Sequence, residues 1–147
     1  MKKVLLIVAF IATTTIMFGQ ANKGLNFGIG LSNSGLPIYV NYDIPVAANL
    51  TIAPSVQANL NGFDWITPAV KIDYYFDDLL GIPETFDFYG GANLGFTIWL
   101  NEANGTSGLY LGIELGGRWW FNENMGLNLE FAGGTGFGTK LGLSMKM

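Results

Sequence analysis

The stretch LYLGIELGGRWWF, residues 109–121, decides the fold of this chain. Its odd-numbered positions are apolar or glycine, whereas its charged residues, Glu114 and Arg118, occupy even-numbered positions. Successive side chains of a β-strand point to opposite faces of the sheet, so this alternation predicts a strand whose two faces meet different surroundings.

The same alternation occurs eight times along the chain, and turn signals rich in Asn and Gly separate the runs. Proline removes a donor from the ladder of backbone hydrogen bonds, so we expect a bulge or a strand end at Pro54 and at Pro68. The apolar faces of the eight expected strands lie within residues 25–31, 38–44, 50–60, 66–76, 86–98, 109–121, 127–133 and 137–147.

Composition excludes several classes of function. Only 12% of the 147 residues are charged, against about 25% in a usual soluble domain, although half are hydrophobic. The sequence has no Cys and no His, which excludes Ser/His/Asp and Cys/His catalysis and thiolate metal sites. We therefore expect no enzymatic activity, no cofactor and no metal. The net charge of −4 argues against a nucleic-acid partner.

The distribution of charge indicates which face of the strands points outward. No Asp, Glu, Lys or Arg interrupts the apolar faces, and the opposite faces consist mainly of Gly, Ala, Ser, Thr and Asn. A soluble barrel would need charged residues on its outer face, and an eight-stranded barrel has little room inside for large apolar groups. The apolar face therefore faces lipid, and the sheet must close on itself. The fold predicted for residues 22–147 is all-β, an eight-stranded antiparallel up-and-down transmembrane β-barrel.

Two further features fit a membrane location. Residues 1–21 have the basic start, apolar middle and small final residues of a cleaved secretory signal peptide. Aromatic residues gather near the expected strand ends, where they would lie at the level of the lipid headgroups. These residues are Tyr42, Tyr74, Phe76, Phe86, Phe88, Trp119 and Phe121 at one end, and Trp65 and Trp99 at the other.

The stretches GGRWWFNEN (116–124) and GLNLEF (126–131), followed by a strand that ends the chain, resemble the small eight-stranded outer membrane β-barrel proteins of Gram-negative bacteria. That group includes the OmpA transmembrane domain and OmpX. The resemblance implies export through the periplasm, a place in the outer membrane, membrane lipids as partners, and a last strand read by the barrel-assembly machinery. Met147 departs from the usual terminal Phe.

Charged residues on the inner faces are tolerable only as pairs. Hairpin geometry places Glu130 opposite Lys140 and puts Arg118 about one diagonal step from Glu130. We therefore predict an ion-pair network that plugs the lumen, with Arg118 as its anchor. Its members would be Glu114, Arg118, Glu130, Lys140, Lys71 and Asp73.

An even number of strands puts both termini on one side, which is expected to be periplasmic. The outer loops, near 33–36, 61–65, 101–108 and 133–136, would then be short, and the inner connection 77–85 unusually long. The function expected is that of a monomeric outer membrane barrel with a structural or interaction role. A narrow channel for ions or small solutes is the first alternative. A soluble secreted barrel that binds an apolar ligand is the second.

Overall fold

The computed structural model describes residues 21–135 and 138–147. The expected signal peptide, except for Ala21, and the expected strand residue Phe137 lie outside the described residues.

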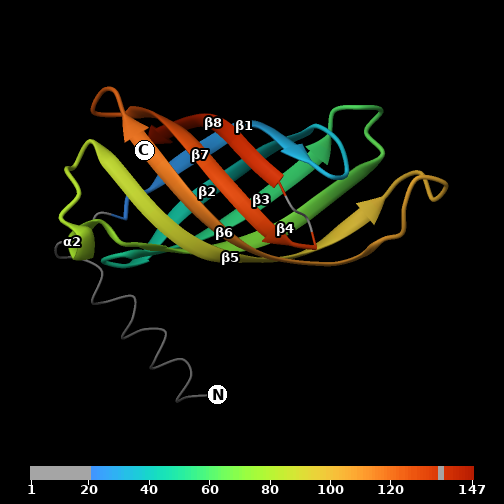
Figure 1. The fold of residues 1–147 in the computed structure, drawn as a ribbon, viewed down its shortest axis with the longest axis horizontal. Helices are drawn as coiled ribbons and strands as arrows, with labels where there is room; N and C mark the ends of the chain where they lie inside the picture. The colour runs from blue at the N-terminus through green and yellow to red at the C-terminus, as the bar shows by residue number, and fades with distance from the viewer. Residues whose placement is uncertain (1–20, 136–137) are drawn as a thin grey trace, which may run out of the picture.

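Eight antiparallel strands form one closed barrel in which each strand pairs with the next along the chain and β8 pairs with β1 (Figure 1). This confirms the predicted fold. One short helix, α2 (Asp77–Leu80), lies in the connection between β4 and β5. The strands are β1 (Gly24–Ser32), β2 (Pro37–Ala47), β3 (Leu50–Asn59), β4 (Trp65–Tyr75), β5 (Phe86–Trp99), β6 (Gly108–Trp120), β7 (Met125–Gly134) and β8 (Gly138–Lys146).

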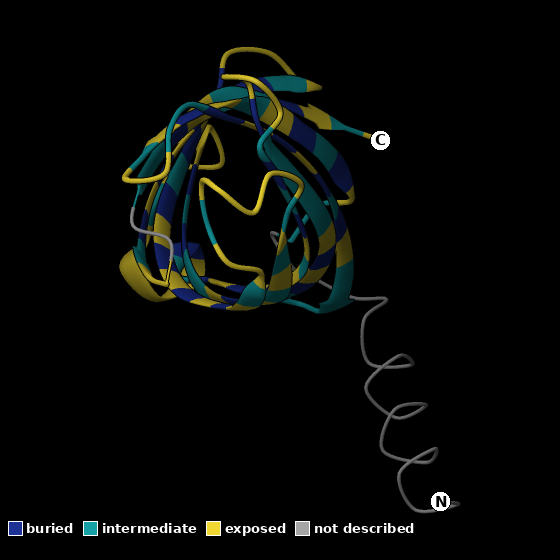
Figure 2. Cartoon of the chain, turned by 90° about the vertical axis from the view of Figure 1, so that its right-hand side faces the viewer, coloured by how far each residue is buried: buried dark blue, intermediate teal, exposed yellow. Residues whose placement is uncertain are grey.

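Buried and exposed residues alternate along the strands around the whole ring (Figure 2). In β6, Ile113 is 72% exposed, whereas its neighbour Glu114 is 5% exposed. Large apolar side chains therefore cover the outside of the barrel and polar side chains fill the inside, as the distribution of charge predicts. Within residues 21–135 and 138–147, no helix has the length and apolar character needed to cross a membrane.

Both ends of the described chain lie at the same end of the barrel as α2 (Figure 1). The backbone N–H of Met147 donates to the carbonyl of Lys23, and that of Lys146 donates to the carbonyl of Asn124 in the β6–β7 turn. The loops β1–β2, β3–β4 and β5–β6, together with Thr135 after β7, lie at the opposite end. The predicted division of the connections between the two ends is therefore confirmed.

The expectation of a bulge or strand end at Pro54 and Pro68 is wrong. Both prolines lie inside continuous strands, where Pro54 and Pro68 are exposed on the outer face. The register between β3 and β4 runs without a shift from Leu50 to Ala58. Among the described strand pairs, the register shifts between Pro45 and Ala47, next to the tight β2–β3 turn.

The two ends of the barrel differ in their aromatic residues. At the end with α2, the predicted outer residues Tyr74, Phe86, Trp119 and Phe121 are 38–48% exposed. At the opposite end the prediction is wrong for Trp65, which is 5% exposed and lies inside the barrel, and for Trp99, which lines the cavity inside that end. Trp65 shares the odd-numbered face of β4 with inward-facing residues, so the alternation places its ring in the lumen. Its indole N–H donates to the carbonyl of Ser34 at 3.2 Å.

Candidate functional site in the barrel lumen

The lumen contains most of the charged side chains of the strands. Their exposed fractions are between 2% and 8%, so the barrel wall and the neighbouring side chains shield them from water. These residues are Asp43, Lys71, Asp73, Asp87, Glu114, Arg118, Glu130 and Lys140. They form two groups, which lie at different positions along the barrel axis.

The first group, called the Lys71 cluster, consists of Lys71, Asp73, Glu114, Glu130 and Lys140. The Lys71 Nζ lies 2.5 Å from Glu114 Oε1, 2.8 Å from Glu130 Oε1 and 3.5 Å from Asp73 Oδ2. The Lys140 Nζ lies 3.4 Å from Glu130 and 3.6 Å from Glu114. Lys71 is therefore the central cation, and it joins carboxylates from its own strand, β6 and β7.

Two neutral side chains also donate hydrogen bonds to the carboxylates of this cluster. The Tyr89 hydroxyl donates to Glu130 Oε1 at 2.9 Å, and the Asn93 amide donates to Glu114 Oε2 at 2.8 Å. Charge-assisted hydrogen bonds of this kind are stronger than neutral ones. They fix both carboxylates in place from the β5 side of the lumen.

The second group, called the Arg118 cluster, consists of Arg118, Asp43 and Asp87. The guanidinium Nη2 lies 3.0 Å from Asp43 Oδ2, and Nη1 lies 3.4 Å from Asp87 Oδ2. The Trp120 indole N–H also donates to Asp87 Oδ2, at 2.9 Å. The planar fork of arginine can contact two carboxylates at once, and Arg118 here joins β2 to β5 across the lumen.

The structure brings five of the six predicted network residues together in the Lys71 cluster and places Arg118 in the other cluster. The predicted pairing of Glu130 with Lys140 is confirmed by the β7–β8 register. Arg118 has no ion pair with Glu130 among the described contacts, because the residue opposite it on β5 is Asp87. The predicted single network is therefore wrong in this respect, and Asp43 and Asp87 are the members that it lacked.

Large aromatic side chains share the lumen with the charges, which the emphasis on small inner residues missed. The inward aromatic residues that are buried are Tyr39, Trp65, Tyr75, Tyr89, Tyr110 and Trp120. Glycines make room for them: a Cβ atom at Gly116 would collide with the ring of Tyr89. The sequence signal was present, because these rings occupy the same alternating positions as the charged residues.

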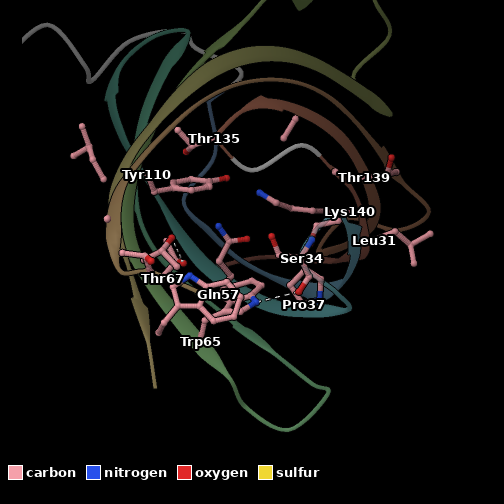
Figure 3. A pocket seen from close by; sticks show the side chains of 18 residues that line it. Leu31, Ser34, Pro37, Gln57, Trp65, Thr67, Tyr110, Thr135, Thr139 and Lys140 are labelled. Atoms are coloured by element: carbon pink, nitrogen blue, oxygen red, sulfur yellow. Dashed lines mark hydrogen bonds between the residues drawn. The ribbon is translucent and has the colours of Figure 1, made fainter. Parts of the chain in front are cut away.

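A cavity of about 240 Å³ lies at the end of the barrel opposite α2. Figure 3 shows the side chains that line it. Trp65 and Trp99 form part of its wall, with ring centroids 6.5 Å apart, and the hydroxyls of Thr67 and Thr97 share a hydrogen bond of 2.9 Å. Tyr110 and Lys140 point into it. Between this cavity and the end of the barrel with α2, the lumen is occupied by the two clusters. We call this cavity the vestibule.

The chain resembles known proteins in structure but not in sequence. No family model matches the sequence, and no curated protein matches it significantly. Among solved structures, a de novo designed transmembrane β-barrel has a TM-score of 0.71 at 12% identity, with 86% of this chain and 96% of that chain covered.

Two natural barrels are also similar. The N-terminal β-barrel domain of OprF from Pseudomonas aeruginosa has a TM-score of 0.66 at 14% identity, with coverage of 88% and 99%. The outer membrane protein Ail of Yersinia pestis has a TM-score of 0.53 at 14% identity, with coverage of 86% and 99%. The fold is that of the small eight-stranded transmembrane barrels. The resemblance seen in the sequence is thus confirmed at the level of architecture, for nearly the whole barrel.

At the other end of the barrel, the α2 connection carries one fully buried carboxyl group. Asp77 is 0% exposed, and its Oδ1 accepts a hydrogen bond of 2.6 Å from the backbone N–H of Phe88. Burial raises the pKa of Asp77 to about 6, because desolvation disfavours the charged form more than this hydrogen bond favours it. Leu79 and Leu80 beside it are 71% and 60% exposed.

Proposed function

We propose that this protein is an integral barrel of the outer membrane of a Gram-negative bacterium, with a structural or interaction role and no enzymatic activity. Its lumen is closed by the Lys71 and Arg118 clusters. The observation that carries the proposal is the arrangement of the barrel, with large apolar side chains outside and buried, mutually paired charges inside. The fold shared with OprF and Ail supports it.

The outer surface is suited to lipid contact. Leu111, Leu115, Leu129 and Phe131, on β6 and β7, are 41–56% exposed and leave no charged residue between them on that face. In water this surface would be a large apolar patch of the kind that drives association. In hydrocarbon it needs no partner, and closure of the sheet satisfies the backbone. The proposed partners are therefore membrane lipids, and the barrel-assembly machinery during insertion.

The proposal also concerns the ends of the chain and its assembly state. Residues 1–21 would direct export and be removed, leaving residues 22–147 as a monomeric barrel with its termini and α2 in the periplasm. Cell fractionation and N-terminal sequencing of the membrane-bound form test this. A folded barrel in the outer membrane fraction should also change its gel mobility on boiling. Recovery from the soluble periplasmic fraction would contradict the proposal.

A soluble barrel that binds an apolar ligand is disfavoured by the interior. Such a protein needs a large apolar cavity, whereas most of the described lumen is filled by buried charged, amide and hydroxyl groups and by aromatic rings. The 240 Å³ vestibule lies inside the barrel, and Lys140 and Tyr110 point into it with their polar ends.

Conductance measurements distinguish a closed barrel from a narrow channel. We expect the wild-type protein in planar lipid bilayers to give no stable single-channel currents, because the two clusters occupy the lumen below the vestibule. A double variant, Lys71→Ser with Glu130→Ser, removes a central ion pair of 2.8 Å together with most of its volume. It should increase ion passage if it folds, which a change in gel mobility on boiling would verify. Stable currents from the wild type would support the channel instead.

A further inference from the structure

The Lys71 cluster contains one more carboxyl group than it has ammonium groups. Asp73, Glu114 and Glu130 face only Lys71 and Lys140 among the described cations. All five residues are between 2% and 8% exposed. With every group ionised, the cluster would carry an uncompensated negative charge in a place shielded from water. Such a charge is strongly unfavourable, and a buried group usually avoids it by binding a proton.

The remaining described cations of the lumen do not compensate this charge. Arg118 is engaged by two carboxylates of its own cluster. Lys146 lies 4.2 Å from the centre of the Trp120 ring, and Trp120 donates to Asp87 in the Arg118 cluster. No described cation outside the Lys71 cluster therefore compensates its third carboxyl group.

Asp73 is the least well paired of the three carboxyl groups. Its contact with Lys71, at 3.5 Å, is the longest of the three that Lys71 makes. Among the described residues its Oδ1 has no hydrogen-bond partner. That oxygen fills the space that a Cβ atom at Gly91 would take, so it packs against backbone without a donor. This environment suits a neutral carboxylic acid.

Thr51 provides an independent observation. It lies directly opposite Asp73 in the β3–β4 register, on the same inner face. Its side chain is 0% exposed, and its hydroxyl Oγ1 has no partner within the described parts of the chain. A protonated carboxyl group is a donor that a hydroxyl oxygen can accept from. Because Asp73 Oδ1 lies over Gly91 of β5, the Asp73 carboxyl group would have to turn toward β3 to reach this hydroxyl.

We propose that the Lys71 cluster is a proton-binding site, in which Asp73 holds one proton at neutral pH. The cluster is then electrically neutral, with Glu114 and Glu130 as the carboxylates of Lys71 and Lys140. The site is a property of the barrel interior and does not depend on whether the barrel conducts ions.

Infrared spectroscopy of the folded protein in detergent micelles at pH 7 tests this site. We expect the wild type to show a carbonyl stretching band of a protonated carboxylic acid. The band should shift when only the aspartates carry ¹³C in their carboxyl groups. It should be lost in Asp73→Asn and kept in Asp43→Asn, which makes the same chemical change in the Arg118 cluster.

Three results would overturn the proposal. They are the absence of the band from the wild type, a band that aspartate labelling does not shift, and a band that persists in Asp73→Asn. The labelling experiment uses the unmodified chain, so it gives a decision even if Asp73→Asn does not fold. Where the variant folds, its urea midpoint should match that of the wild type, because asparagine replaces one neutral group by another. Glu130→Gln, which removes an ionised partner, should lower the midpoint.

Discussion

Replacement of Arg118 by alanine provides a direct test of the lumen geometry. The guanidinium contacts Asp43 at 3.0 Å and Asp87 at 3.4 Å, and its carbon lies 5.3 Å from the ring centres of both Tyr89 and Trp120. Arg118→Ala would leave two carboxylates, 2% and 6% exposed, without their cation. Removing one partner of a buried ion pair costs about 3–5 kcal/mol.

We therefore expect Arg118→Ala to lose about 3–5 kcal/mol of unfolding free energy. Equilibrium urea unfolding in detergent micelles, followed by tryptophan fluorescence, measures this loss. The matched control is Lys23→Ala, which removes an exposed cation near the same end of the barrel. Its ammonium lies 5.8 Å from the centre of the Tyr42 ring, so this variant should lose at most about 1 kcal/mol. If the two variants lose the same small amount, the Arg118 cluster does not contribute to stability, and its carboxylates are not shielded from water as the structure shows them.

Three further predictions concern the wall, the packing of the lumen and the α2 connection. Leu111 faces lipid and is 47% exposed, so Leu111→Lys should lower the free energy of unfolding by about 2–4 kcal/mol and reduce the fraction of protein that folds into lipid vesicles. The control Glu102→Lys, in the exposed β5–β6 loop, should fold like the wild type. Equal folding of both variants would refute the outward orientation of Leu111. In Gly116→Ala the new Cβ meets the Tyr89 ring, so the free energy of urea unfolding should fall by about 1–3 kcal/mol. Gly133→Ala has open space at its Cβ and should show no such loss. Similar losses in both variants would argue against the packing of Tyr89 over Gly116. The ¹³C carboxyl resonance of Asp77 should titrate near pH 6. Because its native pKa is raised, the native state binds more protons than the unfolded state, so the contribution of Asp77 to stability should fall as pH rises from about 4 to 6. This pH dependence should disappear in Asp77→Asn, and an ordinary aspartate titration would contradict the burial.

The strands and the orientation of the barrel could be predicted because both depend on local alternation. A period of two in apolar residues fixes which side chains share a face, and the absence of charge from one face indicates lipid. The pairing of Glu130 with Lys140 could be predicted for the same reason, since a short hairpin fixes the register of neighbouring strands.

Contacts that cross the lumen could not be predicted in this way. Arg118 on β6 reaches Asp43 on β2, and Lys71 on β4 reaches Glu130 on β7. These distances depend on the diameter of the barrel and on the tilt of its strands, which the alternation does not specify. The inward position of Trp65 differs from these cases. The alternation of residues in β4 does indicate an inward side chain at position 65. The prediction of an outward side chain relied instead on the general preference of tryptophan for membrane interfaces.

The seam between β1 and β8 has a consequence for the timing of biogenesis. It joins residues as distant in the chain as Gly24 and Lys146 through an unbroken register. Until the ribosome has released the final segment, the half-built cylinder has two unsatisfied edges, which hydrocarbon does not tolerate. A nascent or truncated polypeptide therefore has to be held in an unfolded, chaperoned form, and insertion has to follow completion of synthesis.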